Sequence, residues 1–386
     1  MSKIKDIAFF TSIRSEYGVM IPFLKKIQNN PNFNLKLVVG GAHLLEEHGN
    51  TINEIINDGL EIDCKLPFLD NENDATALTR AMSKLQLQIG EYLAINKPDI
   101  LIVVGDRFEL LPVVSAALVL GVPIAHLSGG DVTEGAIDNQ IRHAVSKISH
   151  LHFAGTETSK NNLLKMGEEE WRVFNVGEPG IDCILSIDLI DRKELYLDLN
   201  LDESKPTVIA TLHPETISNV INEEYVIDLF MRLLKEFPSH QFLVTASNFD
   251  LGGNVINGTL KQLSGGFDQI KFVPSLGQKR YYSILKYADF MLGNSSSGII
   301  EAQSFLLPVV NIGARQEGRE RNVNTLDVGL QIDEIIAAAK KTQDVNFRNL
   351  IEKSENLYGN GRCADEIIKC FNSIEKEDLF LKKSTF

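Results

Sequence analysis

Short apolar runs alternate with longer amphipathic segments along most of the chain. The apolar runs contain little polar alternation, which is typical of strands buried on both faces of a parallel sheet. In the first half, we expect such strands at Lys5–Thr11, Leu35–Val39, Ile100–Val104, Pro123–Leu127, Phe153 and Val173–Val176. Helices are expected between the strands, among them Val19–Gln28 and Leu110–Leu120. This order predicts right-handed strand–helix–strand units in a doubly wound α/β sheet.

The same pattern starts again after a charged, Asp-rich stretch at Ser186–Lys205. The strands expected there are Thr207–Thr211, Gln241–Thr245, Ile270–Val273, Phe290–Leu292 and Val309–Ile312, with a long helix over Glu223–Glu236. We therefore expect two doubly wound α/β domains, residues 1–185 and 186–365, and a helical tail over residues 366–386. Ligands of such sheets bind beyond the carboxyl ends of the strands, so two facing domains predict a site in the cleft between them.

Composition and charge narrow the class of protein. With 386 residues, of which 44% are hydrophobic and 23% charged, the chain is typical of a soluble globular protein. The net charge of −14 without a basic block argues against nucleic acid or an anionic membrane as a partner, because phosphate backbones and headgroups attract clustered Lys and Arg. Four cysteines without a CxxC pair, and no signal peptide, predict a cytoplasmic location.

Polar residues follow two strands near the start of the chain. Arg14 lies in the turn after the first strand, beside a helix expected to begin near Val19. This arrangement is typical of an anion site, but also of a capped turn with a solvated Arg. Asp106 and Arg107 follow the third strand, where they could line a cleft or serve as a helix cap and a surface side chain.

The segment after the fourth strand, from His126 to His143, is rich in groups that carry chemistry. It contains a Gly pair, at which the backbone can approach a ligand closely, and the carboxylates of Asp131 and Asp138. Its spacing matches neither HExxH nor DxD, so we expect no metal. His143 stands on an amphipathic pattern that is also typical of a structural histidine.

In the second half, two further segments follow strands. His213 precedes a proline, which favours an extended backbone, and its imidazole suits acid–base chemistry; a simple polar turn is the alternative. Gly293–Ala302 places small hydroxyl residues at an expected helix start, which suits a diphosphate, and Glu301 would reach a ribose. Neither GxGxxG nor a Walker A motif occurs. Arg315 lies in a basic loop that could neutralise a leaving group or simply be solvated.

Six segments occur in the order found in UDP-N-acetylglucosamine 2-epimerases, and together they span nearly all of residues 7–330. They are RSEYG, GDRFE, GGDVTEGAIDNQIRH, LHPET, GNSSSGIIE and GARQEGRE. The chain therefore resembles this family, and the long third segment and the last one resemble its hydrolysing branch. That branch makes a free mannose-type sugar for sialic-acid-like nonulosonates. The resemblance implies a GT-B fold of two Rossmann-like domains, no cofactor, and a homodimer or homotetramer.

The resemblance also implies roles for individual residues. Asp106, Asp138 and His213 would be the catalytic ionisable groups. Many relatives carry a Glu where this chain has Ser128, so that role would be vacant or pass to Asp131 or Asp138. The residues that would contact the sugar or the nucleotide are Arg14, His43, Arg107, Ser128, Arg142, Asn294, Ser295, Ser296, Glu301 and Arg315.

The implied reaction removes the C2 proton and expels UDP from C1, and water then adds to the resulting glycal. The TEGA segment resembles a branch that acts on 2,4-diacetamido-2,4,6-trideoxy sugars for legionaminic-type acids. The expected substrate is therefore UDP-N-acetylglucosamine or UDP-2,4-diacetamido-2,4,6-trideoxyglucose. A non-hydrolysing epimerase, a glycosyltransferase of the same architecture and a non-catalytic binder of nucleotide sugars are the alternatives.

Overall fold

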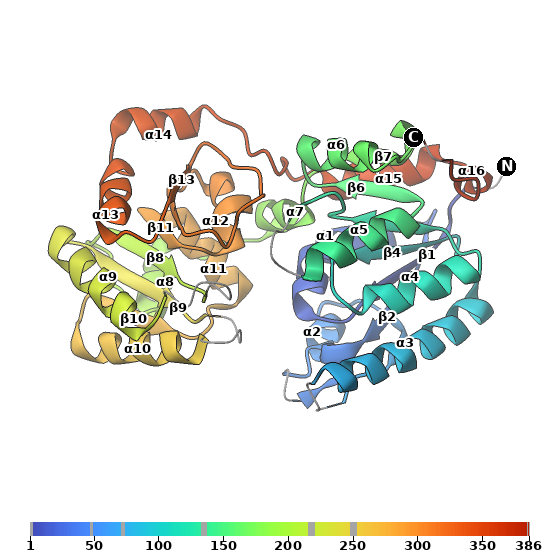
Figure 1. The fold of residues 1–386 in the computed structure, drawn as a ribbon, viewed down its shortest axis with the longest axis horizontal. Coiled ribbons are helices and arrows are strands. Elements are labelled where there is room, and N and C mark those ends of the chain that lie inside the picture. The colour runs from blue at the N-terminus through green and yellow to red at the C-terminus, as the bar shows by residue number, and fades with distance from the viewer. Residues whose placement is uncertain are drawn as a thin grey trace. The chain divides into compact units, whose positions relative to one another are not determined.

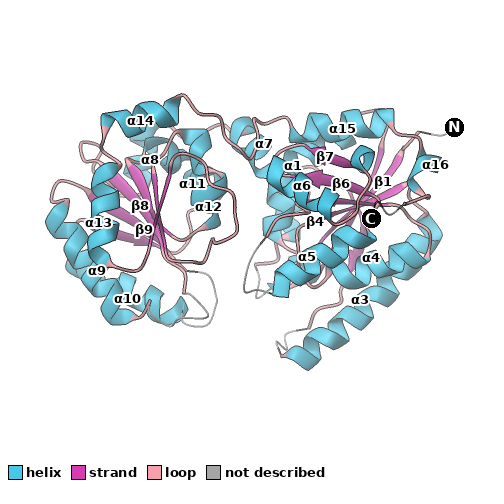
Figure 2. Cartoon of the chain, turned by 45° about the horizontal axis from the view of Figure 1, so that its top comes forward, coloured by secondary structure: helices cyan, strands magenta, loops and turns pink. Residues whose placement is uncertain are grey.

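The chain forms two compact units in a computed structural model that describes residues 3–46, 49–70, 74–132, 137–214, 221–247, 253–383 and 385. The first unit comprises residues 1–186 and 358–386, and the second comprises residues 187–357. Each unit contains one parallel sheet with helices packed around it (Figures 1 and 2). No helix in the described ranges is long and apolar enough to cross a membrane.

The sheet of the first unit has seven strands in the order β3-β2-β1-β4-β5-β6-β7. Their bounds are β1 (Asp6–Thr11), β2 (Asn34–Gly40), β3 (Ile62–Leu66), β4 (Ile100–Val104), β5 (Ile124–Leu127), β6 (Leu151–Ala154) and β7 (Val173–Asn175). The strand order reverses between β1 and β4. This position, which we call the first switch point, is where open α/β sheets bind ligands.

Helices cover both faces of this sheet. They are α1 (Arg14–Gln28), α2 (Ile52–Asn57), α3 (Ala75–Asn96), α4 (Leu110–Val119), α5 (Ile137–Ile148), α6 (Glu157–Lys165), α7 (Pro179–Ser186), α15 (Cys363–Ser373) and α16 (Lys376–Leu379), with 3₁₀ turns η1 (Gly41–Leu44) and η3 (Glu170–Arg172). Alternate residues of β1 lie in two separate cores. Ile7 and Phe9 belong to one core, and Ala8 and Phe10 belong to the core on the other face. The uninterrupted apolar strands of the sequence are therefore buried on both faces.

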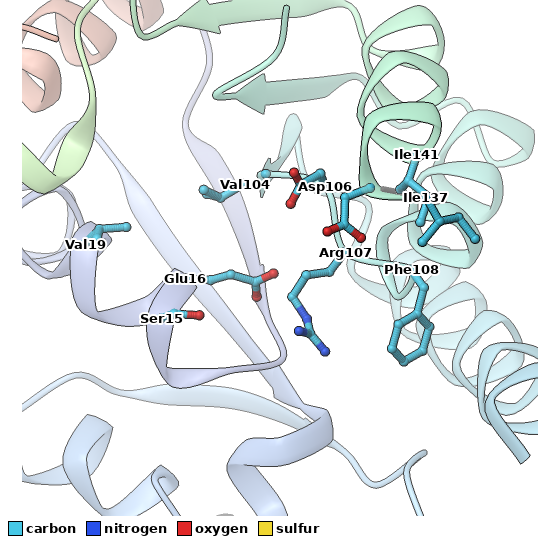
Figure 3. A pocket seen from close by; sticks show the side chains of 11 residues that line it. Ser15, Glu16, Val19, Val104, Asp106, Arg107, Phe108, Ile137 and Ile141 are labelled. Carbon is cyan, nitrogen blue, oxygen red and sulfur yellow. The ribbon is translucent and has the colours of Figure 1, made fainter. Parts of the chain in front are cut away.

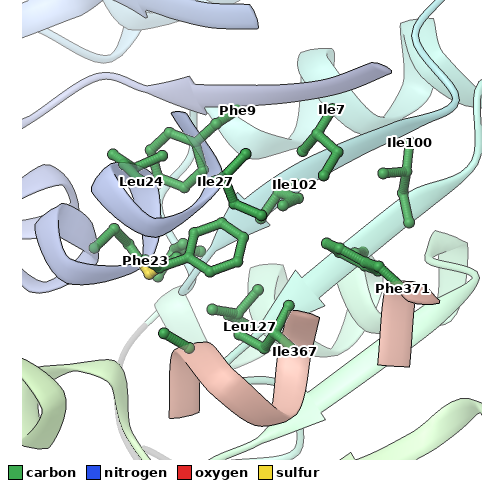
Figure 4. Packing of buried hydrophobic residues seen from close by; sticks show 14 of the residues in the cluster. Ile7, Phe9, Phe23, Leu24, Ile27, Ile100, Ile102, Leu127, Ile367 and Phe371 are labelled. Carbon is green, nitrogen blue, oxygen red and sulfur yellow. The ribbon is translucent and has the colours of Figure 1, made fainter. Parts of the chain in front are cut away.

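The C-terminal helix α15 belongs to the core of the first unit. Its Ile367 and Phe371 pack with residues of β1, β4 and α1 (Figure 4). The ring centroid of Phe371 lies 5.8 Å from that of Phe153 and 6.5 Å from that of Phe33. We expected a helical tail over residues 366–386. In the structure α15 covers one face of the first sheet, because its buried apolar side chains belong to that core.

The second unit repeats the design with six strands in the order β10-β9-β8-β11-β12-β13. The strands are β8 (Thr207–Thr211), β9 (Gln241–Thr245), β10 (Ile270–Val273), β11 (Phe290–Gly293), β12 (Val309–Ile312) and β13 (Thr325–Val328). The helices are α8 (Arg192–Asp198), α9 (Glu223–Glu236), α10 (Gly253–Gly266), α11 (Gly277–Tyr287), α12 (Ser296–Ile300), α13 (Ile332–Lys341) and α14 (Val345–Glu352), with the 3₁₀ turn η4 (Ala302–Phe305). The strand order of this sheet reverses between β8 and β11, and we call this position the second switch point.

The expected fold class of two doubly wound α/β sheets is confirmed. Two details differ from expectation. The strands β3 and β13 were not anticipated, because both are edge strands with half-exposed polar residues. The helix expected to begin near Val19 begins at Arg14 instead, because Glu16 and Tyr17 are buried and extend its inward face.

Candidate active site

A pocket of about 380 Å³ lies at the first switch point (Figure 3). Residues of α1, of the loop after β4 and of α5 line it: Ser15, Glu16, Val19, Val104, Gly105, Asp106, Arg107, Phe108, Ile137, Asp138 and Ile141. Of the sequence-predicted site residues, Asp106, Arg107 and Asp138 therefore share one pocket. It has the position expected for a ligand site in this type of sheet.

Arg142 connects the Asp106 carboxylate after β4 with the backbone of Asp131 after β5. Its side chain is only 5% exposed and forms an ion pair with Asp106. The same guanidinium donates through Nη1 to the backbone oxygen of Asp131, at 3.1 Å. The Asp131 carboxylate accepts a hydrogen bond from the Ser159 hydroxyl. Arg142 thus positions Asp106, and its predicted contact with substrate stays a prediction.

A second ion pair involves Arg107, another residue that lines the pocket. The Arg107 guanidinium donates to the fully buried Glu109 carboxylate from Nη2 at 2.7 Å and from Nε at 3.1 and 3.2 Å. Glu16 projects from α1 toward this loop (Figure 3). Burial, assisted by the charge of Glu109, raises the pKa of Glu16 to about 8. Neither glutamate was predicted as a site residue, because the sequence does not display burial.

Two predicted ligands of the first unit make contacts of their own. Arg14 is half-exposed and donates to the Glu54 carboxylate at 2.8 Å. His43 is fully buried, with Nε2 3.1 Å from the Thr11 hydroxyl and Nδ1 2.8 Å from the Thr51 hydroxyl. Burial lowers the pKa of His43 to about 4. This geometry gives His43 a structural role, and its contact with a sugar stays a prediction.

Ser128, at the position where the resemblance leads us to expect a glutamate, has a carboxylate beside it. Its hydroxyl donates to Oε2 of Glu178 at 2.9 Å, and its backbone is left-handed, with φ of 58°. Glu178 follows β7 and lies fifty positions further along the chain. A carboxylate is therefore present next to the Ser128 position. No local pattern reveals this neighbour, because only the fold brings the two residues together.

At the second switch point, Asn294 fixes the backbone of His213. The Asn294 side chain accepts from the His213 N–H at 2.7 Å and donates to the His213 oxygen at 2.9 Å. The imidazole Nδ1 lies 3.4 Å from the Ser247 hydroxyl. Burial and the nearby charge of Arg315 lower the pKa of His213 to about 4. The lowered pKa favours the neutral imidazole at physiological pH, the form that can accept a proton, although it also makes that imidazole a weaker base.

Gly293 makes the close approach of β11 to β8 possible. Its φ is 136°, and a Cβ there would lie 1.9 Å from the Thr211 backbone oxygen. Behind it, the backbone oxygen of Asn294 accepts from Arg315 Nη1 at 3.2 Å and from Gln316 Nε2 at 3.0 Å. Three predicted residues of the second unit, His213, Asn294 and Arg315, thus meet at one point.

The predicted phosphate segment is more compact than expected. Ser295 caps α12 by accepting from the Ser297 N–H at 3.4 Å, and α12 is only five residues long. Anion binding here would therefore depend on the Ser295 and Ser296 hydroxyls, local amides and Arg315 rather than on a long helix dipole. Glu301 accepts from the Ser297 hydroxyl, and also from the Tyr282 hydroxyl at 3.1 Å.

Parts of two sequence motifs lie outside the described residues. They are residues 133–136, the TEGA segment of the third motif, and residues 215–216, the end of LHPET. Among the residues that the structure does describe, no cluster of three or more His, Cys, Asp or Glu side chains could hold a metal ion.

Comparisons with known proteins agree on one family. Its model, described as UDP-N-acetylglucosamine 2-epimerase, matches residues 25–372. The chain is 35% identical to the GDP/UDP-N,N'-diacetylbacillosamine 2-epimerase (hydrolyzing) of Campylobacter jejuni, over 99% of both chains. It is 33% identical to the UDP-N,N'-diacetylbacillosamine 2-epimerase (hydrolyzing) of Legionella pneumophila, over 98% of this chain and 99% of that one.

A solved structure shares the fold. It is the UDP-GlcNAc 2-epimerase from Neisseria meningitidis bound to UDP-GlcNAc, with a TM-score of 0.81 and 18% identity. The comparison covers 96% of this chain and all of that chain.

Proposed function

Because this chain belongs to the UDP-N-acetylglucosamine 2-epimerase family, we propose that it is a hydrolysing 2-epimerase. It converts a UDP-linked 2-acetamido sugar to UDP and the free mannose-configured sugar. The observation that carries this proposal is the end-to-end similarity to two relatives that are named as hydrolysing 2-epimerases. Their names favour N,N'-diacetylbacillosamine, the 2,4-diacetamido-2,4,6-trideoxy sugar, over N-acetylglucosamine as the group linked to UDP.

The first step is an elimination. A base removes the C2 proton, the C–H electron pair forms the C1=C2 double bond, and the bond from C1 to the UDP oxygen breaks. Because a C2 proton is weakly acidic, the base must be positioned against it. The candidates are Asp106 and Asp138, which line the pocket, and the neutral His213. The ion pair with Arg142 holds the Asp106 carboxylate in place.

The second step is hydration of the glycal. A base takes a proton from water as the water oxygen bonds to C1, and the electron pair of the C1=C2 bond takes a proton from an acid at C2, on the face opposite to the one that lost it. This inversion needs proton-transferring groups on both faces of the ring, so more than one ionisable residue must take part. That requirement fits the several carboxyls of the pocket better than a single base.

The second unit is suited to hold UDP. Negative charge grows on the β-phosphate as the bond to C1 breaks, and fixed donors stabilise such charge without reorganising. Ser295, Ser296 and Arg315 would supply these donors, and Glu301 would accept from the ribose hydroxyls. We also place the enzyme in the cytoplasm, as a homodimer or homotetramer, with a product that feeds the synthesis of sialic- or legionaminic-type acids.

Proton NMR in D₂O tests this function. Purified protein is incubated with UDP-N-acetylglucosamine, UDP-2,4-diacetamido-2,4,6-trideoxyglucose or the GDP-linked form of the latter. We expect UDP release together with a free mannose-configured sugar that carries deuterium at C2, and faster turnover of the diacetamido sugar. A UDP-linked product without free UDP would mean a non-hydrolysing epimerase. Intact sugars despite UDP binding would favour a transferase or a binder.

A further inference from the structure

Glu16 has an unusual environment for a carboxyl group that lines a pocket. It is only 8% exposed, although it forms part of the pocket wall. Its Oε2 accepts from the Ser12 N–H at 3.2 Å and from the Ser12 hydroxyl at 3.3 Å. Among the described residues, Oε1 is buried without any hydrogen-bond partner. Buried polar atoms nearly always have a partner, so a ligand atom is the natural candidate for the missing one.

The charged groups around Glu16 do not favour its ionised form. Three of them are carboxylates: Asp106 and Glu109 in the loop after β4, and Asp138 on α5. The same loop contributes one cation, Arg107. On α1 itself, the Arg14 charge is paired with Glu54 of α2.

The cations of this region are already paired with other carboxylates. Arg107 is the one cation among the described residues that line the pocket, and its hydrogen bonds go to Glu109. Asp106 is paired with Arg142. Burial and the charge of Glu109 favour the neutral acid and outweigh the opposing effects of Arg107 and Ser12, so the pKa of Glu16 is raised.

We propose that Glu16 binds the sugar of the substrate as a neutral carboxylic acid, with Oε1–H donating a hydrogen bond to an acceptor oxygen of that sugar. This inference rests on the proposed function, because the acceptor belongs to the nucleotide sugar. A neutral donor suits the site, since the substrate's diphosphate is anionic and Asp106 and Asp138 already line the same pocket. Ionisation of Glu16 would remove the donated proton and add a further negative charge.

The Gln and Ala variants separate this role from a structural one. Glu16→Gln keeps the shape and an N–H donor, so we expect its kcat/KM at pH 7 to stay within about threefold of wild type. Glu16→Ala removes the donor and should lower kcat/KM by about 10-fold or more, mainly through KM. If Glu16→Ala does not fold, the kcat/KM of Glu16→Gln at pH 7 and its pH profile test the proposal without it. A Gln variant as impaired at pH 7 as a folded Ala variant would overturn the proposal.

The pH profile gives a readout that mere packing would not move. In wild type, KM should rise above about pH 8 as Glu16 ionises, and in Glu16→Gln this rise should be absent. The matched control is Glu61→Gln, which changes an exposed glutamate and should retain the wild-type profile. An unchanged alkaline rise in Glu16→Gln would overturn the proposal.

A titration that does not depend on activity keeps the two proposals apart. In protein labelled with ¹³C at the glutamate carboxyl, the resonance missing from Glu16→Gln identifies Glu16. We expect that resonance to be protonated at pH 7 and to titrate near pH 8. If this resonance shows that Glu16 is already ionised at pH 7, the proposed role of Glu16 is overturned, even in an enzyme that hydrolyses the expected sugar nucleotide. Wild-type protein that turns over no sugar nucleotide would overturn the proposed function, even with Glu16 neutral.

Discussion

The two switch points have the same topology and different chemistry. In both sheets the strand order reverses between a first strand and the strand that begins the second half, β1 and β4 in one unit and β8 and β11 in the other. The first switch point presents carboxyls that are held by ion pairs. The second presents hydroxyls, an amide and a neutral imidazole. The topology of the sheet therefore determines where a ligand can bind, and the side chains at that position determine which chemistry is possible there.

A pair of buried glutamates sharpens this comparison. Glu16 and Glu301 each accept a hydrogen bond from a serine hydroxyl four residues earlier in the chain, Ser12 and Ser297. Burial raises the pKa of both carboxyls. Glu301 also accepts from Tyr282 through its other oxygen, whereas Oε1 of Glu16 has no partner among the described residues. Both carboxyl oxygens of Glu301 therefore have a partner within the protein, whereas Glu16 has one for Oε2 alone.

The largest expected effect is on proton transfer at the first switch point. Asp138→Asn should lower kcat by about 10²- to 10⁴-fold, because a positioned acid or base contributes that much. Asp138 is exposed, so the melting temperature should not change. The rate of UDP release gives kcat, and calorimetry should show unaltered UDP affinity. A variant with the wild-type rate would move proton transfer away from Asp138.

Asp106→Asn is the companion variant. It should lose activity as well, but it also leaves the buried Arg142 charge without its carboxylate. Breaking a buried pair from one side destabilises a protein by about 3–5 kcal/mol. Its melting temperature should therefore fall, in contrast to that of Asp138→Asn.

The pH dependence of stability should change when Glu16 is replaced. The folded pKa of about 8 lies above the ordinary value of 4.5, so the unfolded chain releases this proton first as the pH rises. Wild type therefore loses stability between about pH 4.5 and pH 8, on the order of 5 kcal/mol at most. Glu16→Gln should lack this loss and melt at higher temperature than wild type above pH 8.

Thermal melts over this pH range measure the difference. Glu61→Gln, the exposed control, should follow wild type throughout. Parallel curves for wild type and Glu16→Gln would mean that Glu16 is an ordinary carboxylate.

The second switch point depends on the close strand contact at Gly293. Gly293→Ala would place a methyl group against the Thr211 carbonyl at a positive φ, and should cost about 3 kcal/mol or more. Gly258→Ala is the matched control in the same unit, because it lies in α10 with open space around it. That helical position should gain up to about 1 kcal/mol. Denaturant unfolding compares the two, and equal stabilities would contradict the inferred strand contact.

The smallest expected effect concerns UDP binding by the second unit. Ser295→Ala removes one hydroxyl and should weaken UDP binding by about 1 kcal/mol, close to fivefold, with little change in kcat. Calorimetry with UDP measures the affinity. A large fall in kcat with unchanged UDP affinity would reverse the assignment of roles to the two switch points.

The central strands and the residues that follow them were predictable from sequence. Gln241–Thr245 and Glu223–Glu236 have the expected bounds, because buried strands and amphipathic helices leave clear periodic patterns. Asp106 and Asp138 were expected in one site, and they line one pocket. Their catalytic roles stay predictions.

Other features depend on contacts that no local pattern displays. Glu178 meets Ser128 across fifty residues, and the Ile62–Leu66 strand is half polar because it lies at a sheet edge. The sequence shows Glu16 as a polar residue in a polar turn. Only the fold shows that it is buried, and its burial is what alters its chemistry.

The return of the chain to the first unit has a consequence for biosynthesis. On the ribosome, every strand of the first sheet emerges before the second unit. The apolar surface around Phe33 and Phe153 stays uncovered until Phe371 has been synthesised. The described residues in the core of the second unit all belong to that unit, so this core can form as soon as they emerge. The nascent first unit therefore exposes an incomplete core throughout synthesis of the inserted unit, and during that interval the growing chain is most prone to aggregate.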